Sequence, residues 1–276
     1  MLCFPNAKIN IGLKVVEKRP DGFHNLETVF YPIGLKDALE VVPNQDGNAY
    51  SIHVTGLNVK DMQSDPEANI VTRAYRLLQK DFDLIPLSVF LHKAIPTGAG
   101  LGGGSSDAAN ALVLIQKMNK LHLTDAVLEQ YSAQLGADCA FFIKNNPIFA
   151  TGIGTSFEDV SLTLAGLHLI LIKPDIHVST PEAYSMVKPA KPERSLKELI
   201  ENPLETWKDA VVNDFEASVF AKYPKIASIK DTLYRKGAIY ASMSGSGSSV
   251  FGLFKEQIEL KSDFSDCFYW SETLRL

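Results

Sequence analysis

Apolar and polar residues alternate along the first part of the chain with two different periods. From Ile9 to Val15 every second side chain is apolar, which is the pattern of a half-buried strand. Over 69–80 the apolar side chains instead recur every three or four residues, which indicates a helix with one buried face. The same reasoning predicts further strands over 27–33, 39–42, 50–54 and 88–94, and further helices over 105–120 and 124–135.

The second part of the chain mixes strands with shorter helices. A glycine-containing hairpin is predicted over 149–157 and a buried strand over 167–173, after which several prolines break the chain into short helices and loops. Helices are also predicted over 207–220 and 226–235, and strands over 238–242 and 249–254. These elements predict an α+β fold with two lobes.

The segment over 96–109 carries the strongest indication of chemistry. Five glycines, at 98, 100 and 102–104, free the backbone to take positive φ angles and to approach a ligand closely. Ser105, Ser106 and Asp107 then open a helix, whose first N–H groups have no partner within the helix and carry the positive end of its dipole. Such a loop is a cradle for phosphate, and a nucleotide triphosphate is the expected ligand. A glycine-rich turn without a ligand is the alternative.

Three known glycine-rich loops are distinguishable from this one. A Walker loop ends in Gly-Lys-Ser/Thr, and no lysine follows the glycines here. A dinucleotide-binding loop requires an acidic residue roughly 20 positions later, where this chain has only Lys117, Met118, Asn119 and Lys120. A protein-kinase loop lies between two strands, whereas this loop leads into a helix.

Composition and charge narrow the class of protein. The chain has 276 residues, of which 46% are hydrophobic and 21% charged, as in ordinary globular proteins. Its net charge of −5 argues against nucleic acid as the main partner. Cys3, Cys139 and Cys267 are widely spaced, so we expect reduced thiols. The scattered histidines predict no bound structural metal, and neither a secretory signal nor a membrane-spanning stretch is apparent. We therefore expect a cytoplasmic protein without a membrane partner.

Three separated segments together resemble the motifs of the GHMP kinases, which phosphorylate small alcohols. They lie at 5–10, 96–109 and 242–248, and so extend over almost the whole chain. The resemblance implies a two-lobed GHMP kinase-like fold, with an ATP-binding lobe over 1–158, a second lobe over 159–276 and the active site in the cleft between them. It also implies ATP and Mg²⁺ as cofactors, a small-molecule substrate, and a monomer or weak homodimer.

A narrower resemblance follows from Arg-Pro-Asp-Gly-Phe-His-Asn-Leu-Glu-Thr-Val-Phe at 19–30. This run is similar to the branch of the family that phosphorylates the 2-hydroxyl of a diphosphocytidyl methylerythritol in the non-mevalonate route to isoprenoids. Leu-Gly-Ala-Asp at 135–138 and Val-Ser-Thr-Pro at 178–181 agree with it. Two departures are Phe23, where the family has Tyr, and Cys139-Ala140, where it has Val-Pro. An aromatic face is kept at the first position.

The resemblance assigns roles to particular residues. Asp138 is the expected general base, and Lys8 the neighbouring cation that favours the alkoxide and the transferring phosphoryl charge. Ser105 or Ser106 would give an oxygen to phosphate or Mg²⁺, although both serines are also suited to capping the helix. The nucleotide-binding set comprises Asn69, Lys93, Pro96, Thr97, Gly98, Ala99, Gly100, Leu101, Gly102, Gly103, Gly104, Ser105 and Ser106, with Asn69 and Lys93 near the adenine.

The acceptor is expected to be read through its cytosine. His24 would hydrogen-bond the pyrimidine edge, with Phe23 nearby and Tyr184 as a second stacking face. Asn10 and Thr180 are expected to contact the methylerythritol hydroxyls. The alternatives are a GHMP kinase for another alcohol, homoserine or a mevalonate-type acceptor, and a nucleotide-binding protein without catalysis.

Overall fold

The computed structural model describes residues 1–45, 49–57, 65–185 and 187–276. The fold is α+β, as predicted, and the chain forms two compact units. Unit 1 comprises Met1–Ala7, Leu35–Thr97 and Gly102–Asn146, and unit 2 comprises Lys8–Gly34, Gly98–Leu101 and Pro147–Leu276. The glycine-rich loop therefore contributes residues to both units.

This division differs from the predicted one at residue 158, because the first long hairpin belongs with the second half of the chain. Strands β2 (Asn6–Lys18) and β3 (His24–Lys36) share a sheet with β7 (Ile148–Thr151) and β8 (Ser156–Asp159), in the order β2-β3-β7-β8. Leu13 also forms a bridge with Asn213, 200 positions later. Local periodicity carries no information about such distant partners.

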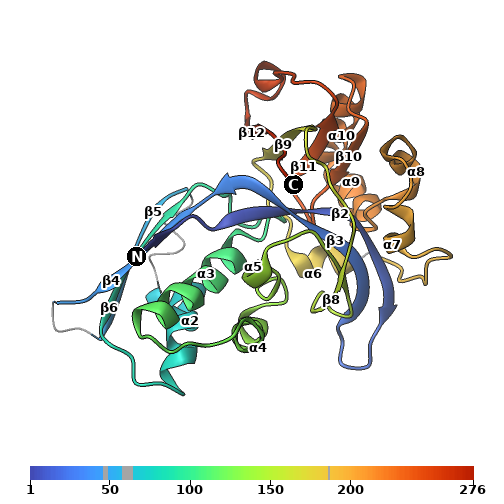
Figure 1. Ribbon diagram of the computed structural model, residues 1–276. Coiled ribbons are helices and arrows are strands. Elements are labelled where there is room, and N and C mark those ends of the chain that lie inside the picture. The colour runs from blue at the N-terminus through green and yellow to red at the C-terminus, as the bar shows by residue number, and fades with distance from the viewer. Residues whose placement is uncertain (46–48, 58–64, 186) are drawn as a thin grey trace. The chain divides into compact units, whose positions relative to one another are not determined.

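Unit 1 has a four-stranded sheet with helices on one face (Figure 1). The strand order is β1 (Leu2–Cys3), β4 (Ala38–Pro43), β6 (Leu87–Lys93) and β5 (Tyr50–Gly56), and β5 runs parallel to β6. Its helices are η1 (Pro66–Ala68), α2 (Ile70–Gln79), α3 (Gly103–Met118), α4 (Asp125–Leu135) and α5 (Phe141–Lys144). Leu39, Val89, Leu78 and Leu112 belong to the core between sheet and helices. This core fixes α3, and with it the end of the glycine-rich loop.

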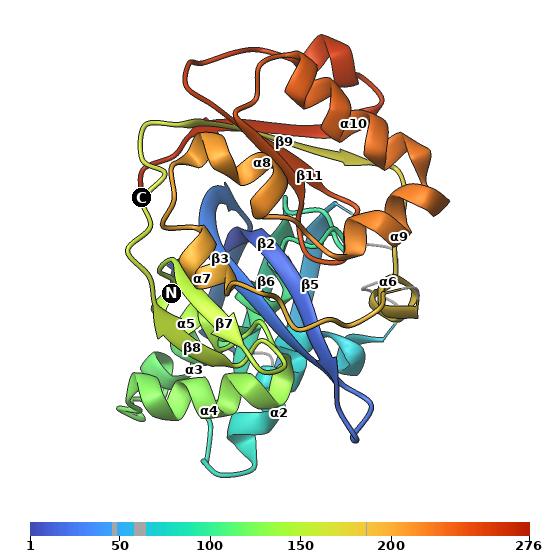
Figure 2. The same cartoon turned by 90° about the vertical axis from the view of Figure 1, so that its right-hand side faces the viewer.

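Unit 2 contains a second sheet of four antiparallel strands besides the β2-β3-β7-β8 sheet. Its order is β10 (Tyr240–Met243), β11 (Val250–Phe254), β9 (His168–Pro174) and β12 (Cys267–Thr273). Helices α9 (Phe215–Lys222) and α10 (Pro224–Arg235) lie beside this sheet (Figure 2) and share its core. The remaining short elements are α6 (Thr180–Ser185), α7 (Leu196–Leu199), η2 (Leu204–Thr206), α8 (Trp207–Ala210) and η3 (Lys261–Phe264).

The single helix predicted over 207–220 is wrong, because the chain breaks between α8 and α9. The Leu13 amide donates to the Val212 carbonyl over 3.0 Å, and the Asp214 amide donates to the Leu13 carbonyl over 2.8 Å. Backbone groups that would continue the helix are therefore bonded to β2. The interruption places Asn213 against the last of the three motif segments.

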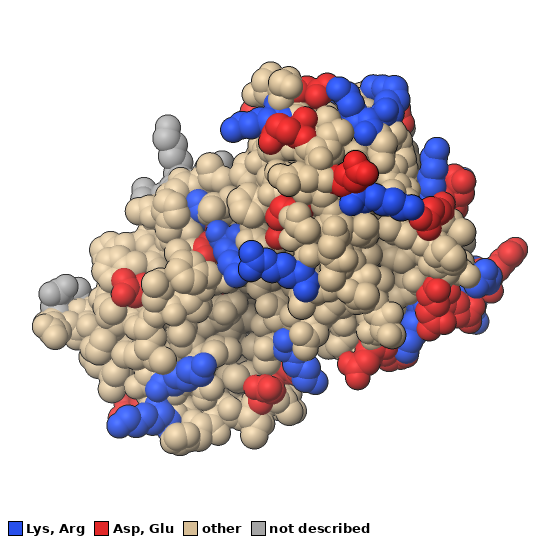
Figure 3. Space-filling model, turned by 45° about the horizontal axis from the view of Figure 1, so that its top comes forward, with Lys and Arg blue, Asp and Glu red and all other residues tan. Residues whose placement is uncertain are grey.

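Charged side chains of both signs lie close together on the face shown in Figure 3. In unit 2, Lys225 pairs with Asp266 over 2.5 Å and Lys236 pairs with Asp263 over 2.6 Å. Such exposed pairs contribute little to stability. In the part of the chain that is described, no helix combines the length and apolar character needed to cross a bilayer.

Candidate active site

Helix α3 begins at Gly103, two residues earlier than predicted, and no side chain caps its N-terminal amides. The N-cap is Gly102, with φ +69° and no side-chain hydrogen bond to the helix. Ser105 and Ser106 therefore lie inside the first turns, and the alternative that they cap the helix is wrong. Because no side chain caps the first amides, the helix start is suited to receive an anion.

The middle of the glycine-rich loop packs against the second glycine-rich motif within unit 2. Gly100 has φ +75°, and a Cβ added there would lie 2.0 Å from the Ser244 carbonyl oxygen. The Ser244 hydroxyl donates to the Gly100 carbonyl over 2.8 Å. The Ser249 amide donates to the Ala99 carbonyl over 3.3 Å. Glycine is required at 100 because the two backbones approach so closely.

Replacing Gly100 by alanine is expected to lower the free energy of unfolding by about 2–4 kcal/mol, from the strained φ and the forced separation of the two backbones. Gly166→Ala is a matched control, because Gly166 has φ +87° but nothing within 4 Å of an added Cβ. That variant should lose only about 1 kcal/mol. Urea unfolding of both variants measures the difference. Equal losses would show that the contact with Ser244 contributes nothing.

Lys8 is a buried side chain of β2, with 3% of its surface exposed, and not a surface lysine. Its Nζ donates to Asn10 Oδ1 over 2.7 Å and to the Gly100 carbonyl over 3.3 Å. Asn10 Nδ2 donates in turn to Thr28 Oγ1 over 2.8 Å. The chain of contacts fixes the Lys8 ammonium beside the glycine-rich loop. Lys8, Asn10 and Gly100 are thus in contact with one another, and Thr28 joins them although no sequence pattern marked it.

The turn over 244–248 is fixed from both sides. Asn213 Nδ2 donates to the carbonyls of Met243 and Gly245, each over 2.8 Å. The hydroxyls of Thr180 and Ser246 lie 3.4 Å apart, so Thr180 adjoins this turn. Nothing local in the sequence marks Asn213, because its role depends on the break between α8 and α9.

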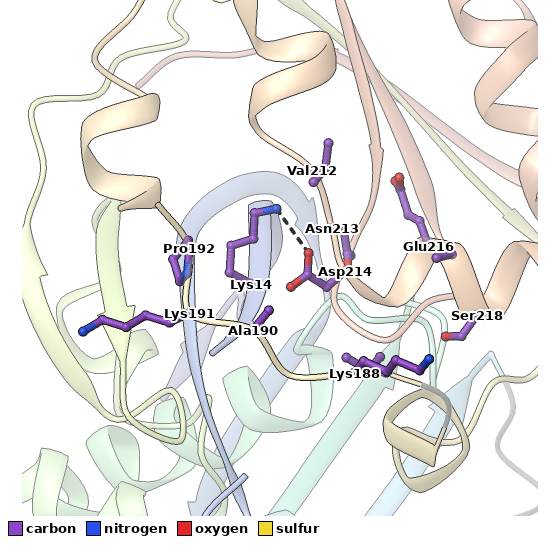
Figure 4. A pocket seen from close by; sticks show the side chains of 12 residues that line it. Lys14, Lys188, Ala190, Lys191, Pro192, Val212, Asn213, Asp214, Glu216 and Ser218 are labelled. Atoms are coloured by element: carbon purple, nitrogen blue, oxygen red, sulfur yellow. Dashed lines mark hydrogen bonds and ion pairs between the residues drawn. The ribbon is translucent and has the colours of Figure 1, made fainter. Parts of the chain in front are cut away.

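Asn213 also lines a cavity of about 600 Å³ in unit 2 (Figure 4). The charged side chains that line this cavity do not point toward one common ligand position. Lys14 pairs with Asp214 over 3.2 Å, and Glu216 pairs with Lys230 over 2.6 Å. Lys191 extends away from the other lysines in Figure 4. We therefore do not count the cavity as part of the site.

Asp138, the expected base, follows α4 in unit 1 and is half-buried. Its neighbour Cys139 is fully buried, and burial raises the pKa of the Cys139 thiol to about 11, with a hydrogen bond from Ser105 opposing the shift. A Cβ on Gly136 would lie 3.3 Å from Cys139 Sγ and 3.9 Å from Ser105 Oγ. The turn that carries Asp138 is thus packed against Ser105 of the glycine-rich loop.

Two of the residues expected to read cytosine contact each other in unit 2. The rings of His24 and Tyr184 stack on each other, with centroids 4.7 Å apart and planes at 22°. Phe215 meets the Tyr184 ring edge-on at 4.7 Å, and Phe23 is 59% exposed. Burial, with a smaller contribution from Lys18, lowers the pKa of His24. A neutral imidazole has one donor and one acceptor nitrogen, which suits the edge of a pyrimidine.

Asn69 and Lys93 both have partners inside unit 1. Asn69 is the N-cap of α2, and its Oδ1 accepts from the Val71 amide over 2.9 Å. Lys93 is 1% exposed and its ammonium contacts the carboxylates of Asp37 and Asp107. The Lys93 ammonium is therefore paired with carboxylates inside unit 1. Its expected position near an adenine stays a prediction. Asp37 was not found from the sequence.

Within the described residues, no group of three or more His, Cys, Asp or Glu side chains could hold a metal ion. A cation carried by phosphates needs only one or two protein oxygens. Ser105 fits that need, because it lies in the first turns of α3, is only half-buried, and has a hydroxyl oxygen with two lone pairs. Ser106 is completely buried.

Comparison with known proteins gives matches over the whole chain. Residues 69–146 match the family model "GHMP kinases N terminal domain", and residues 195–266 match "GHMP kinases C terminal". A 4-diphosphocytidyl-2-C-methyl-D-erythritol kinase of Bacteroides fragilis is 54% identical over 277 residues, covering 100% of both chains.

Solved structures with the same fold include a close and a distant match. A crystal structure of 4-(cytidine 5′-diphospho)-2C-methyl-D-erythritol kinase is 28% identical with a TM-score of 0.80, covering 98% of each chain. A homoserine kinase from Cytophaga hutchinsonii is 16% identical with a TM-score of 0.68, covering 97% of this chain and 94% of that one. The second likeness concerns the fold alone.

Proposed function

Because this chain belongs to the GHMP kinases and, within them, to the family of 4-diphosphocytidyl-2-C-methyl-D-erythritol kinases, we propose that it transfers the γ-phosphoryl group of ATP to the 2-hydroxyl of that diphosphocytidyl methylerythritol. The reaction belongs to the non-mevalonate route to isoprenoids. The full-length identity of 54% to the Bacteroides fragilis protein is the observation that carries the substrate assignment. The geometry of each unit supports it.

The uncapped start of α3 is suited to hold the triphosphate. Amides of its first turn and of the glycine-rich loop can donate to phosphate oxygens, and the helix dipole favours their charge. Thr97, Leu101 and Gly104 belong to this cradle in the proposal, with Pro96 at its start. Phosphoryl transfer depends mainly on such positioning and charge neutralisation.

The acceptor hydroxyl forms a bond to the γ-phosphorus while the bond to the ADP oxygen breaks. In the proposal Asp138 takes the hydroxyl proton, and the Lys8 ammonium neutralises charge that develops on the attacking oxygen and the phosphoryl group. The hydrogen bonds of the Lys8 ammonium to Asn10 and to the Gly100 carbonyl support this role. Asn10 and Thr180 are proposed to contact the methylerythritol hydroxyls.

The cofactor proposed beside ATP is Mg²⁺, with Ser105 as the protein oxygen best suited to it. When bound, the ion supplies positive charge to the phosphate oxygens. We also propose that the enzyme works in the cytoplasm as a monomer or weak homodimer, on a small molecule and not on nucleic acid or a membrane.

Replacing His24 by alanine is expected to raise KM for the cytidyl substrate about tenfold, because an unpartnered polar edge of a bound base loses that much affinity. KM for ATP should not change, since His24 stacks on Tyr184 and lies outside the phosphate cradle. Steady-state kinetics with each substrate varied in turn separates the two constants.

His53→Ala is the control for this variant, because His53 is an exposed residue of β5 that stacks on Phe90. It should leave both KM values unchanged. An unchanged KM for the cytidyl substrate in His24→Ala would mean that this histidine does not read cytosine. The acceptor would then be sought among other alcohols, such as homoserine or mevalonate.

A further inference from the structure

Three charged side chains form a cluster in the interior of unit 1, called here the buried triad: Asp37, Lys93 and Asp107. Each is 1% exposed. Lys93 is the last residue of β6, Asp37 lies between β3 and β4, and Asp107 lies in α3. Lys93 Nζ contacts Asp37 Oδ2 and donates to Asp107 Oδ2 over 2.5 Å. One ammonium thus joins two carboxyl groups from different parts of the chain.

Asp37 fixes the chain where it enters the glycine-rich loop. Besides Lys93, it accepts hydrogen bonds from the Ala94 amide over 2.6 Å and the Ile95 amide over 2.8 Å, both through Oδ1. These are the two residues directly before Pro96. One carboxylate therefore binds three consecutive residues at the start of the loop.

Asp107 fixes the chain where it leaves the loop. It is the fifth residue of α3, one turn after Gly103, at which the helix begins. A Cβ on Gly103 would lie 2.8 Å from Ile95 Cγ2 and 3.4 Å from Lys93 Nζ, so the helix start rests directly on the residues that enter the loop. Through Lys93, the two flanks of residues 96–102 are joined to each other.

The ammonium of Lys93 is paired with both carboxyl groups of the triad, so it is not available to bind a phosphate. Burial lowers the pKa of Lys93, but the two carboxyl groups outweigh burial and the net shift is upward, so the amine is charged. Burial raises the pKa of Asp107 to about 8, against the attraction of Lys93. Asp107 therefore carries its proton at neutral pH.

We propose that Asp37, Lys93 and Asp107 are positioning residues, which hold the two flanks of the glycine-rich loop at the spacing that triphosphate binding requires. This inference rests on the proposed function, because it takes the loop to bind ATP. A purely structural triad would stabilise unit 1 without setting nucleotide affinity. The two roles therefore predict different effects of substitutions in the triad on the affinity of the folded protein for ATP.

The test compares nucleotide affinity in the full-length protein and its variants. Asp107→Ala and Lys93→Met are titrated calorimetrically with a non-hydrolysable ATP analogue and Mg²⁺, at a temperature where circular dichroism shows each to be folded. Displacement of the loop should weaken Kd about tenfold or more. Leu78→Ala is the control, because it removes a completely buried side chain of α2 from the same core. It should lower the melting temperature and leave Kd unchanged. An unchanged Kd in folded Asp107→Ala would overturn the proposal.

If the alanine variant does not fold, the isosteric variant Asp107→Asn tests the positioning role through the pH dependence of Kd. The charged groups that face Asp107 are Lys93 and Asp37. Asp107 also interacts electrostatically with Cys3 of β1, but burial raises the pKa of that thiol to about 11, so Cys3 keeps its proton. As pH passes about 8, Asp107 loses its proton and is repelled by Asp37, so the loop flanks, which these two residues hold, are expected to separate. Wild-type Kd should therefore weaken between about pH 7 and pH 9, and the Asp107→Asn variant should show no such change.

Parallel pH profiles of the wild type and Asp107→Asn would overturn the positioning role. A wild type that phosphorylates its acceptor but shows parallel profiles would leave the proposed function intact. A folded wild type that binds no ATP at any pH would overturn the proposed function, and the positioning role with it.

Discussion

Asparagine in place of Asp138 is expected to lower kcat about 10²–10⁴-fold, the usual contribution of a general base. The amide keeps the size and most hydrogen bonds of the carboxylate but cannot accept the hydroxyl proton. Affinity for ATP should remain, because the phosphate cradle at α3 does not depend on that proton. Single-turnover and steady-state rates at saturating substrate, with calorimetric Kd for an ATP analogue, measure both quantities.

Asp83→Asn is the matched control for this variant, because it makes the same change at an exposed aspartate of unit 1. It should retain wild-type kcat. If Asp138→Asn turned over at the wild-type rate, Asp138 would not be the base. Proton removal would then have to be assigned to another group or to water.

Lys8→Met is expected to lower kcat about 10²–10³-fold, the usual effect of removing one group that stabilises charge in a transition state. Methionine fills the volume of the lysine stem but cannot donate to Asn10 Oδ1 or to the Gly100 carbonyl. The loss should appear mainly in kcat, since the interaction strengthens as charge moves onto the attacking oxygen. Steady-state kinetics of the purified variant gives this value.

Lys14→Met tests whether the effect is particular to Lys8. Both lysines lie on β2, but Lys14 pairs with Asp214 and lines the cavity excluded from the site. Its replacement should leave kcat near the wild-type value. Equal losses in the two variants would point to disturbance of β2 and not to a catalytic ammonium.

Elements with a local signal could be predicted from the sequence. The alternation at Ile9–Val15 gave a strand that the structure extends to Asn6–Lys18, and the helical periodicity after the glycine-rich loop identified α3. Strand β12 was not predicted. All but the last of its residues are only half-buried, so it lacks a clear apolar period. It is ordered by pairing with β9, from Cys267 opposite Pro174 to Thr273 opposite His168.

The family motifs indicated candidate site residues but not how those residues contact one another. The family motifs identified Lys8, Asn10 and Gly100, whose contacts the structure provides within unit 2. The stacking of His24 on Tyr184 joins residues 160 positions apart, and no pattern in either segment indicates it. The same holds for Asp37, an isolated aspartate whose burial with Lys93 becomes evident only in the folded unit.

The most direct test of the proposed function is acceptor-dependent ADP release from purified protein with Mg-ATP. Diphosphocytidyl methylerythritol, homoserine and mevalonate are offered in parallel reactions. We predict turnover with the cytidyl substrate alone, and its loss in Asp138→Asn. Faster turnover with homoserine or mevalonate would contradict the substrate assignment while leaving the phosphate cradle in place. Binding of ATP without turnover of any acceptor would contradict the assignment of catalysis itself.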